Sequence, residues 1–145
     1  MDLTKLFAEM RKRENFTSGE GATEEDIQKV ETVIDVLFPD SYRQFLRTFS
    51  YAWWFGGCVY GIAPGTRWDV VAQTLRARED ELPKGFRPIP RDASVIDLYS
   101  GGGYYALYSK QSRKAGRIEL LSIETRYKAA DEWPSFTDYL EYLLE

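Results

Sequence analysis

The sequence offers few side chains with the chemistry of a catalyst. Histidine is absent, which removes Ser-His-Asp and Cys-His nucleophile systems and the usual catalytic zinc ligand sets. The only cysteine, Cys58, has apolar neighbours, so we expect a packed thiol rather than a reactive one. Asp92 and Asp97 could form a carboxylate pair for a metal or for acid–base work, but no third ligand is evident. The residues therefore predict no enzymatic activity, no catalytic or metal site and no cofactor.

Two short motifs could contact a ligand or a partner. Gly101–Gly103 lack the lysine and the Ser/Thr of a phosphate-binding loop, and they join two expected strands, so a tight hairpin turn is the better account. Glu79, Asp80 and Glu81 form an acidic run at the end of an expected helix. A solvated helix end is the ordinary interpretation of such a run, and contact with a protein partner is the alternative.

Charge and hydropathy narrow the class of partner. The 145 residues carry a net charge of −4, which argues against nucleic-acid binding and is compatible with a basic protein partner. No apolar run is long enough to span a bilayer and the N-terminus lacks a signal-peptide core, so we expect no membrane association and, by default, a cytoplasmic location. Aromatic residues make up 15%, which favours packed cores and protein interfaces. The sequence leaves the oligomeric state open.

Apolar residues at helical spacing predict five helices. They cover the first dozen residues, Thr23–Leu37, the segment after Pro39, the segment from Thr66 to Pro83 and the segment from Ser135. The second and third helices should form a hairpin with one shared apolar side. In the fourth, Thr66 and Asp69 form a capping pair, and the expected apolar stripe consists of Trp68, Val71, Ala72 and Leu75.

Strand signals occupy the rest of the chain and fix the fold class. The expected strands are Cys58–Ile62, Ser94–Tyr99, Tyr104–Ser109 and Arg117–Ile123, with Phe86–Ile89 as a short extended piece at a sheet edge. The order of elements predicts one α+β domain over residues 1–145. Its central, mostly antiparallel sheet should be joined by an N-terminal helix hairpin, one inserted helix and a C-terminal helix.

Tyrosines and one carboxylate alternate with apolar residues in two expected strands. Period-2 alternation puts Ile96 and Leu98 on one face and Asp97 with Tyr99 on the other, and Tyr104 belongs to the tyrosine-bearing side of the next strand. Such a face has the composition of many protein-binding surfaces. The alternative is that the tyrosines simply shield the sheet.

The segment Ser50–Ile62 (SYAWWFGGCVYGI) places two tryptophans beside a glycine pair. Adjacent residues of an extended segment point to opposite sides, so we expect one of Trp53 and Trp54 to pack near Phe45 and Phe49 and the other to be more exposed and available to a partner. The sequence does not say which ring is which. The predicted partner-binding set is Trp53, Trp54, Asp97, Tyr99, Tyr104, Glu79 and Asp80.

Several motifs along the chain resemble one known family. Ala22–Glu31 is similar to its opening helix, and Phe38–Leu46 (FPDSYRQFL) to its proline-x-x-tyrosine-x-x-phenylalanine-leucine signature. Tyr60–Gly61, Gly102–Tyr104 and Ser135–Leu140 are similar to its usual strand, central hairpin and closing helix. In this order the motifs resemble the SMI1/KNR4 (SUKH) superfamily over about Ala22 to Leu144.

The resemblance implies an α+β fold with a central sheet and a binding function. Many bacterial members resemble immunity proteins, which bind and neutralise a cognate polymorphic toxin, often a nuclease, whereas fungal members act as regulatory scaffolds in cell-wall signalling. Two features depart from the family pattern. Ser50–Phe55 intervene before the glycine pair that follows the second helix of the hairpin, and Asp97 lies several residues before the central glycines instead of beside them. We therefore expect an immunity protein that occludes a toxin, with a regulatory scaffold as the alternative.

Overall fold

The computed structural model of the chain describes all residues from 1 to 145. Five α-helices and seven strands confirm the predicted α+β class. The helices are α1 (Leu3–Arg11), α2 (Glu24–Ile34), α3 (Asp40–Phe49), α4 (Val70–Glu79) and α5 (Phe136–Leu143). The strands are β1 (Thr17–Ser18), β2 (Ala52–Trp54), β3 (Gly57–Val59), β4 (Ala93–Leu98), β5 (Gly103–Tyr108), β6 (Ile118–Ser122) and β7 (Ala129–Trp133).

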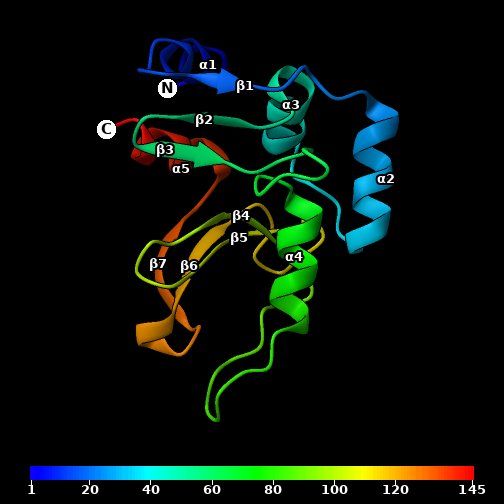
Figure 1. Cartoon of the computed structure of the whole chain (residues 1–145), viewed down its shortest axis with the longest axis vertical. Helices are drawn as coiled ribbons and strands as arrows, with labels where there is room; N and C mark the ends of the chain where they lie inside the picture. Colours follow the sequence, from blue (N-terminus) through cyan, green and yellow to red (C-terminus); the bar gives the residue numbers. More distant parts are fainter.

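The strands form two antiparallel sheets: a four-stranded sheet that corresponds to the predicted central sheet, and a smaller sheet that the sequence did not predict. β1, β2 and β3 make a three-stranded sheet next to α1, and β4–β7 make a four-stranded meander beside α4 (Figure 1). The Tyr60 N–H donates to the Ile96 carbonyl at 2.8 Å and links the two sheets. The first sheet was not predicted because β1 and β2 contain only two and three residues, too few to show a period-2 pattern.

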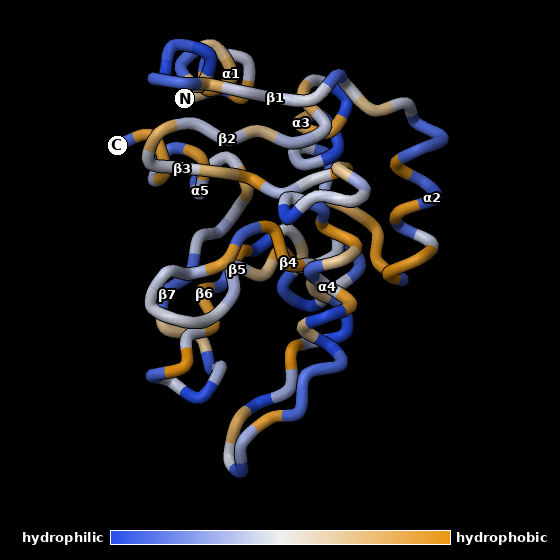
Figure 2. Tube along the Cα trace, in the orientation of Figure 1, coloured by the Kyte–Doolittle hydropathy of each residue, from blue (hydrophilic) through white to orange (hydrophobic).

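The helix hairpin and the C-terminal helix share one main core of 22 buried residues, which also receives side chains from both sheets. Thr23 and Asp26 form the capping box that starts α2, as the sequence predicts. Ile27 and Ile34 of α2 are buried on the side that faces the rest of the molecule, whereas Val33 is exposed (Figure 2). Phe45 of α3 packs against Phe136 of α5 with ring centroids 5.7 Å apart, so α3 and α5 are fixed to each other by aromatic contacts.

α4 begins later than its predicted capping pair. Asp69 is the N-cap, and its carboxylate accepts hydrogen bonds from the Ala72 and Ala63 N–H groups, both at 3.1 Å. Thr66 lies in the preceding turn, where its hydroxyl accepts from the Trp68 N–H at 3.2 Å. The Thr66–Asp69 capping pair was therefore a wrong prediction, since Asp69 caps the helix alone.

The buried face of α4 also differs from the predicted stripe. Its buried residues are Val70, Gln73, Thr74 and Ala77, not Trp68, Val71, Ala72 and Leu75. Two of the buried side chains are polar and have defined partners. Thr74 accepts from the Val95 N–H at 2.9 Å, and Gln73 donates to the Arg67 carbonyl at 2.9 Å. Hydropathy periodicity missed this face because hydrogen bonds offset the cost of burying the two polar groups.

A β-bulge in β4 rearranges the predicted faces of the meander. Val95 pairs with Ala106 and Asp97 with Tyr105, so Ile96 has no partner in β5. The extra residue reverses the alternation. Asp97 shares a face with Tyr105, while Leu98, now 41% exposed, lies opposite Tyr104. The prediction that Ile96 and Leu98 share an apolar face, and that Asp97 and Tyr104 share the other, was wrong for this reason.

The edges of the meander differ from the expectation too. Phe86–Ile89 form no strand, although the Arg87 N–H donates to the Arg126 carbonyl at 2.9 Å. β7 occupies the edge next to β6, with Ile118 paired to Trp133. Its sequence AADEW gives no alternating signal, so the sequence did not predict it.

Candidate functional site

The two tryptophans of β2 have different environments, as the sequence predicts. Trp54 is 4% exposed and belongs to the main core together with Phe45 and Phe49. Trp53 is only half-buried. A Cβ atom on Gly57 would lie 2.5 Å from the Trp54 ring, so only glycine lets β3 cross this indole at that distance. Trp54 is thus the core ring and Trp53 the ring available to a partner.

Three partly exposed rings form what we call the aromatic ladder: Tyr51, Trp68 and Trp53. Trp68 lies between the other two, with centroid separations of 6.0 Å to Tyr51 and 5.9 Å to Trp53, and the ring planes are within 8° and 11° of parallel. Tyr51 and Trp53 are two residues apart in an extended segment and therefore share a face. The turn before α4 supplies Trp68, whose carbonyl accepts from the Gly61 N–H at 2.9 Å. Stacking and this hydrogen bond hold the ladder in place.

A pocket of about 410 Å³ lies beside the ladder, lined by Trp53, Trp54, Gly57, Cys58, Arg67 and Trp68. Arg67 is exposed, and its guanidinium carbon lies 5.7 Å from the centroid of the Trp68 ring. Burial and the adjacent Asp97 raise the pKa of the Cys58 thiol well above its usual range, so the thiol stays protonated. The pocket therefore offers aromatic surface and one cation, and no activated nucleophile.

A second hollow, which we call the Asp97 groove, adjoins this pocket at Gly57. It measures about 560 Å³, and its walls include Asp97, Tyr99, Tyr105, Tyr142 and Glu145. The Asp97 Oδ1 atom accepts from the Leu98 N–H at 2.8 Å and from the Cys58 thiol at 3.6 Å. Burial raises the pKa of Asp97 to about 7, although these two hydrogen bonds and the charge of Arg67 act in the opposite direction.

The predicted partner-binding residues lie on two opposite faces of the β4–β5 pair. Asp97 and Tyr99 line the groove next to Trp53, but Tyr104 lies on the opposite face, where its hydroxyl donates to Asp80 at 3.0 Å. Glu79 ends α4 and is exposed. Tyr104, Asp80 and Glu79 are thus on a different side of β4–β5 from Asp97, because the bulge at Ile96 changes the alternation.

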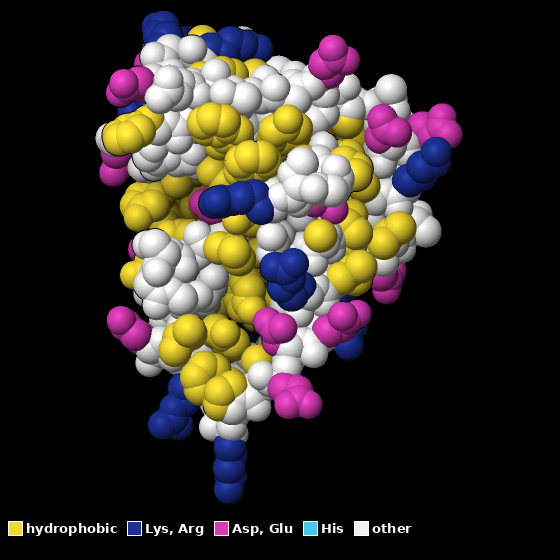
Figure 3. Space-filling view, viewed as in Figure 1, with side chains coloured by type: hydrophobic (Ala, Val, Ile, Leu, Met, Phe, Trp, Pro, Cys, Tyr) yellow, Lys and Arg dark blue, Asp and Glu magenta, His cyan; other side chains and the backbone are white.

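The face around β2 and β3 is rich in exposed hydrophobic atoms. Figure 3 shows hydrophobic side chains gathered over these strands, with one basic side chain lying next to an acidic one among them. Phe55, at the turn between the two strands, is 75% exposed. Exposed aromatic surface of this extent next to charged groups is typical of a protein-interaction face.

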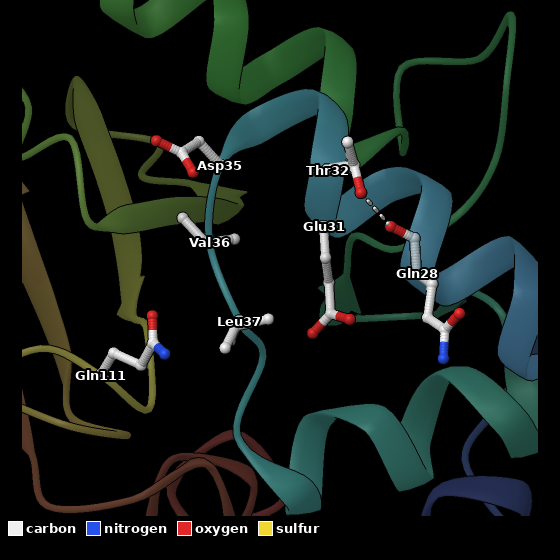
Figure 4. Close-up of a pocket in the computed structure, with 7 residues that line it drawn as sticks. All are labelled: Gln28, Glu31, Thr32, Asp35, Val36, Leu37 and Gln111. Carbon is white, nitrogen blue, oxygen red and sulfur yellow. Dashed lines mark hydrogen bonds between the residues drawn. The ribbon is translucent and has the colours of Figure 1, made fainter.

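A hollow lined mainly by polar residues, between α2 and Gln111, has a structural explanation. Gln28, Glu31, Thr32, Asp35, Val36, Leu37 and Gln111 surround a space of about 520 Å³ (Figure 4). Burial raises the pKa of Glu31, yet its carboxylate is already bound to the Phe38 N–H at 2.7 Å and to Arg43 at 2.5 Å. The Thr32 hydroxyl donates to the Gln28 carbonyl of its own helix at 2.9 Å. These bonds join α2 to the start of α3 and leave few groups for a ligand.

A buried carboxylate in the meander has a similar role. Glu119 is 1% exposed and is bound by Lys114 at 2.8 Å and by the Tyr108 hydroxyl at 2.7 Å. Burial alone would raise the pKa of Glu119, but these hydrogen bonds and the charges of Lys114 and Arg87 lower it on balance. The carboxylate stabilises the sheet and has no spare capacity for catalysis.

Sequence reasoning missed several residues of the site: Tyr51, Arg67, Trp68, Tyr105 and Tyr142. Trp68 was assigned to a helix stripe, and Tyr105 lies in a strand whose pairing with β4 contains the bulge. Tyr51 and Arg67 lie outside the helices and strands, and Tyr142 lies on α5 beside its buried face. The recurrence of Tyr51 and Trp53 at a spacing of two was the one available signal for the ladder.

A comparison with protein families decides the classification. The sequence profile described as SMI1-KNR4 cell-wall (SUKH_5) matches residues 3–145. The chain belongs to the SMI1/KNR4 (SUKH) family. No curated protein sequence matches it significantly.

Membership extends the likeness found in the motifs to nearly the whole chain, α1 included. SUKH domains are in general binding domains without catalytic activity. No helix of this SUKH domain has both the length and the hydropathy needed to cross a bilayer.

Proposed function

We propose that this SUKH domain is an immunity protein that binds a cognate bacterial toxin and neutralises it by occlusion. The observation that carries the proposal is the aromatic ladder, a rigid and partly exposed set of rings beside the Asp97 groove. Tight protein complexes rely on central aromatic anchors that a polar rim surrounds. Trp53 is the proposed anchor, with Asp97 and Tyr99 at its side.

Occlusion fits the chemistry of the site better than catalysis does. The thiol of Cys58 is protonated, and Asp92 and Asp97 lie at opposite ends of β4 and cannot act as a pair. The remaining groups offer shape, aromatic surface and charge. An inhibitor of this kind acts by covering the active surface of its target.

The proposed partner is a basic toxin in the cytoplasm, and a nuclease fits best. A nuclease must bind a polyanion and therefore presents positive surface. The SUKH chain has a net charge of −4, and the Asp97 groove contains both Asp97 and Glu145. Complementary charge would raise the rate of association with the toxin and disfavour binding of acidic proteins.

Co-purification from the native host, followed by a toxicity assay, tests the proposal. The tagged chain should capture one protein that kills a sensitive host when expressed alone and is harmless when expressed with the SUKH chain. Trp53→Ala should abolish protection, and Val33→Ala, at an exposed position of α2, should retain it. A captured protein without toxicity would contradict the immunity function.

A regulatory scaffold is the second candidate, because the matching family carries the description "cell-wall". A scaffold would use the same ladder to hold a host protein without inhibiting it. The two functions separate in one measurement: an immunity protein abolishes its partner's activity at an equimolar ratio, whereas a scaffold leaves that activity intact or increases it.

A further inference from the structure

We propose that the Asp97 groove is the receptor for one arginine side chain of the protein partner, whose guanidinium pairs with Asp97 while its stem lies against tyrosine rings. The inference deepens the proposed function, since it names the chemistry by which the site recognises a basic partner. It rests on the free carboxylate oxygen, on the walls of the groove and on the charges around it.

The carboxylate of Asp97 has an unused side. The chain's own hydrogen bonds, from the Leu98 N–H and the Cys58 thiol, both end on Oδ1, and none ends on Oδ2. Asp97 takes part in none of the ion pairs of the structure, all of which join other carboxylates to Lys, Arg or the N-terminus. A mostly buried carboxylate in this state gains from any cation that can reach it.

The walls of the groove suit a flat cation. Tyr99 and Tyr105 meet edge to face with centroids 6.1 Å apart, and Tyr142, 45% exposed, stands on the last turn of α5. Guanidinium is planar, stacks on aromatic faces and pairs with a carboxylate through two parallel hydrogen bonds. The volume of about 560 Å³ admits such a side chain. A metal ion fits less well, because no group of three candidate ligands exists in the structure.

None of the charged and titratable groups around Asp97 occupies the place where a cation would pair with its carboxylate. They come from β3, the turn before α4, the meander and α5, and they are Cys58, Tyr60, Arg67, Tyr99, Tyr105, Tyr139, Tyr142 and Glu145. Arg67 is the only cation among them, and its guanidinium lies by the Trp68 ring without forming an ion pair to Asp97. Burial raises the pKa of Asp97 to about 7, although the charge of Arg67 lowers it.

Carbon-detected NMR of the side-chain carboxyl groups tests the proposal without the partner. The probe is Nα-acetyl-arginine methylamide, and its neutral isostere Nα-acetyl-citrulline methylamide is the control. We expect the arginine probe to lower the pKa of Asp97 by about one pH unit at millimolar concentration, since a close cation favours the ionised carboxylate. It should also shift the signals of Tyr99, Tyr105 and Tyr142. Asp97→Asn should abolish these shifts, and Asp92→Asn, at an exposed site before β4, should preserve them.

Two results would contradict the proposal that the Asp97 groove binds arginine. One is an equal response to the citrulline probe, and the other is a response spread over exposed carboxylates that Asp97→Asn does not change. Because the probe is a small molecule, either failure would leave the proposed immunity function standing. If the unmodified chain failed to neutralise a captured toxin but Asp97 still responded to the arginine probe, the immunity function alone would be refuted.

Discussion

At the scale of single residues, neighbours in one strand have different environments. Trp54 supports the core against Gly57, and Trp53 stacks on Trp68 at the surface. The alternation of a strand produces this division without any difference in residue type. A binding ring with a core ring beside it is held rigidly, which lowers the entropy lost when a partner covers it.

Alanine substitutions should separate these two tasks. Trp54→Ala should lower the free energy of unfolding by roughly 3–5 kcal/mol, because it leaves a cavity in the main core. Trp53→Ala should cost only about 1 kcal/mol, the value of its stacking contact, and weaken partner binding by about 2 kcal/mol or more. Urea unfolding and calorimetric titration with the captured partner measure the two quantities. If neither substitution changes the affinity of the folded protein, β2 is purely structural.

Asp97 should make stability depend on pH. Its pKa is 3.8 in the unfolded reference and about 7 in the folded protein, so the folded state holds the proton more tightly. Stability from this group is therefore present below about pH 4 and is lost as pH rises to about 7. Asn cannot ionise, so Asp97→Asn should abolish this pH-dependent fall in stability. Relative to the unmodified protein, the variant should have a free energy of unfolding that is higher by roughly 2–4 kcal/mol above pH 7 and no higher below pH 4. Urea unfolding from pH 4 to pH 8 measures it, and a pH-independent difference between the two proteins would contradict the assignment.

At the scale of elements, one bulge and one cap place the site. The bulge at Ile96 turns Asp97 toward Tyr105 and the groove, and the Asp69 cap positions the turn that carries Arg67 and Trp68. The bulge depends on pairing between β4 and β5, whereas the cap joins residues within six positions of each other. The site therefore depends on where α4 and β4 meet the first sheet.

Two substitutions, at Asp69 and at Thr66, test which residue caps α4. Asp69→Ala should cost roughly 1–2 kcal/mol of stability, because its buried carboxylate satisfies the Ala72 and Ala63 N–H groups. It should also weaken partner binding, since the Arg67–Trp68 turn loses its anchor. Thr66→Ala removes only bonds within the exposed turn and should cost less than about 0.5 kcal/mol. Thermal unfolding of the two variants side by side would refute the assigned cap if Thr66→Ala were the more damaging change.

At the scale of the whole molecule, charge and shape set the class of partner. The chain has a net charge of −4, and its exposed aromatic face lies beside carboxylates rather than a basic stripe. Such a surface is consistent with the basic protein partner proposed above and unfavourable for nucleic acid. The long-range part of the attraction between opposite charges acts before contact and is screened by salt.

Association with the partner should therefore be sensitive to ionic strength. Raising NaCl from about 20 mM to 500 mM should reduce the association rate constant by about tenfold or more and change the dissociation rate constant much less. Stopped-flow fluorescence of the tryptophans at several salt concentrations measures both constants. An association rate that is independent of salt would show that the partner is not basic.

Sequence reasoning was most successful where the signal is local. The helices α2 and α3 and the capping box of Thr23 with Asp26 arise from contacts within a few residues, which is why spacing alone predicts them. The motifs that resemble the SUKH family were similarly readable, and the family match over residues 3–145 confirms them. Along β2, alternation predicted that one tryptophan is buried and the other more exposed, which the buried Trp54 and the half-buried Trp53 confirm.

The sequence by itself therefore determined the fold class, the family and the difference in burial between two adjacent tryptophans. Only the tertiary structure decided that Trp54 is the buried one, that Asp97 faces Tyr105 rather than Tyr104, and that Trp68 completes the ladder. The physical reason is that periodicity describes one element at a time. A bulge of one residue, a buried polar face on α4 and two very short strands are stabilised by hydrogen bonds and packing between elements, and these contacts leave no period in the sequence.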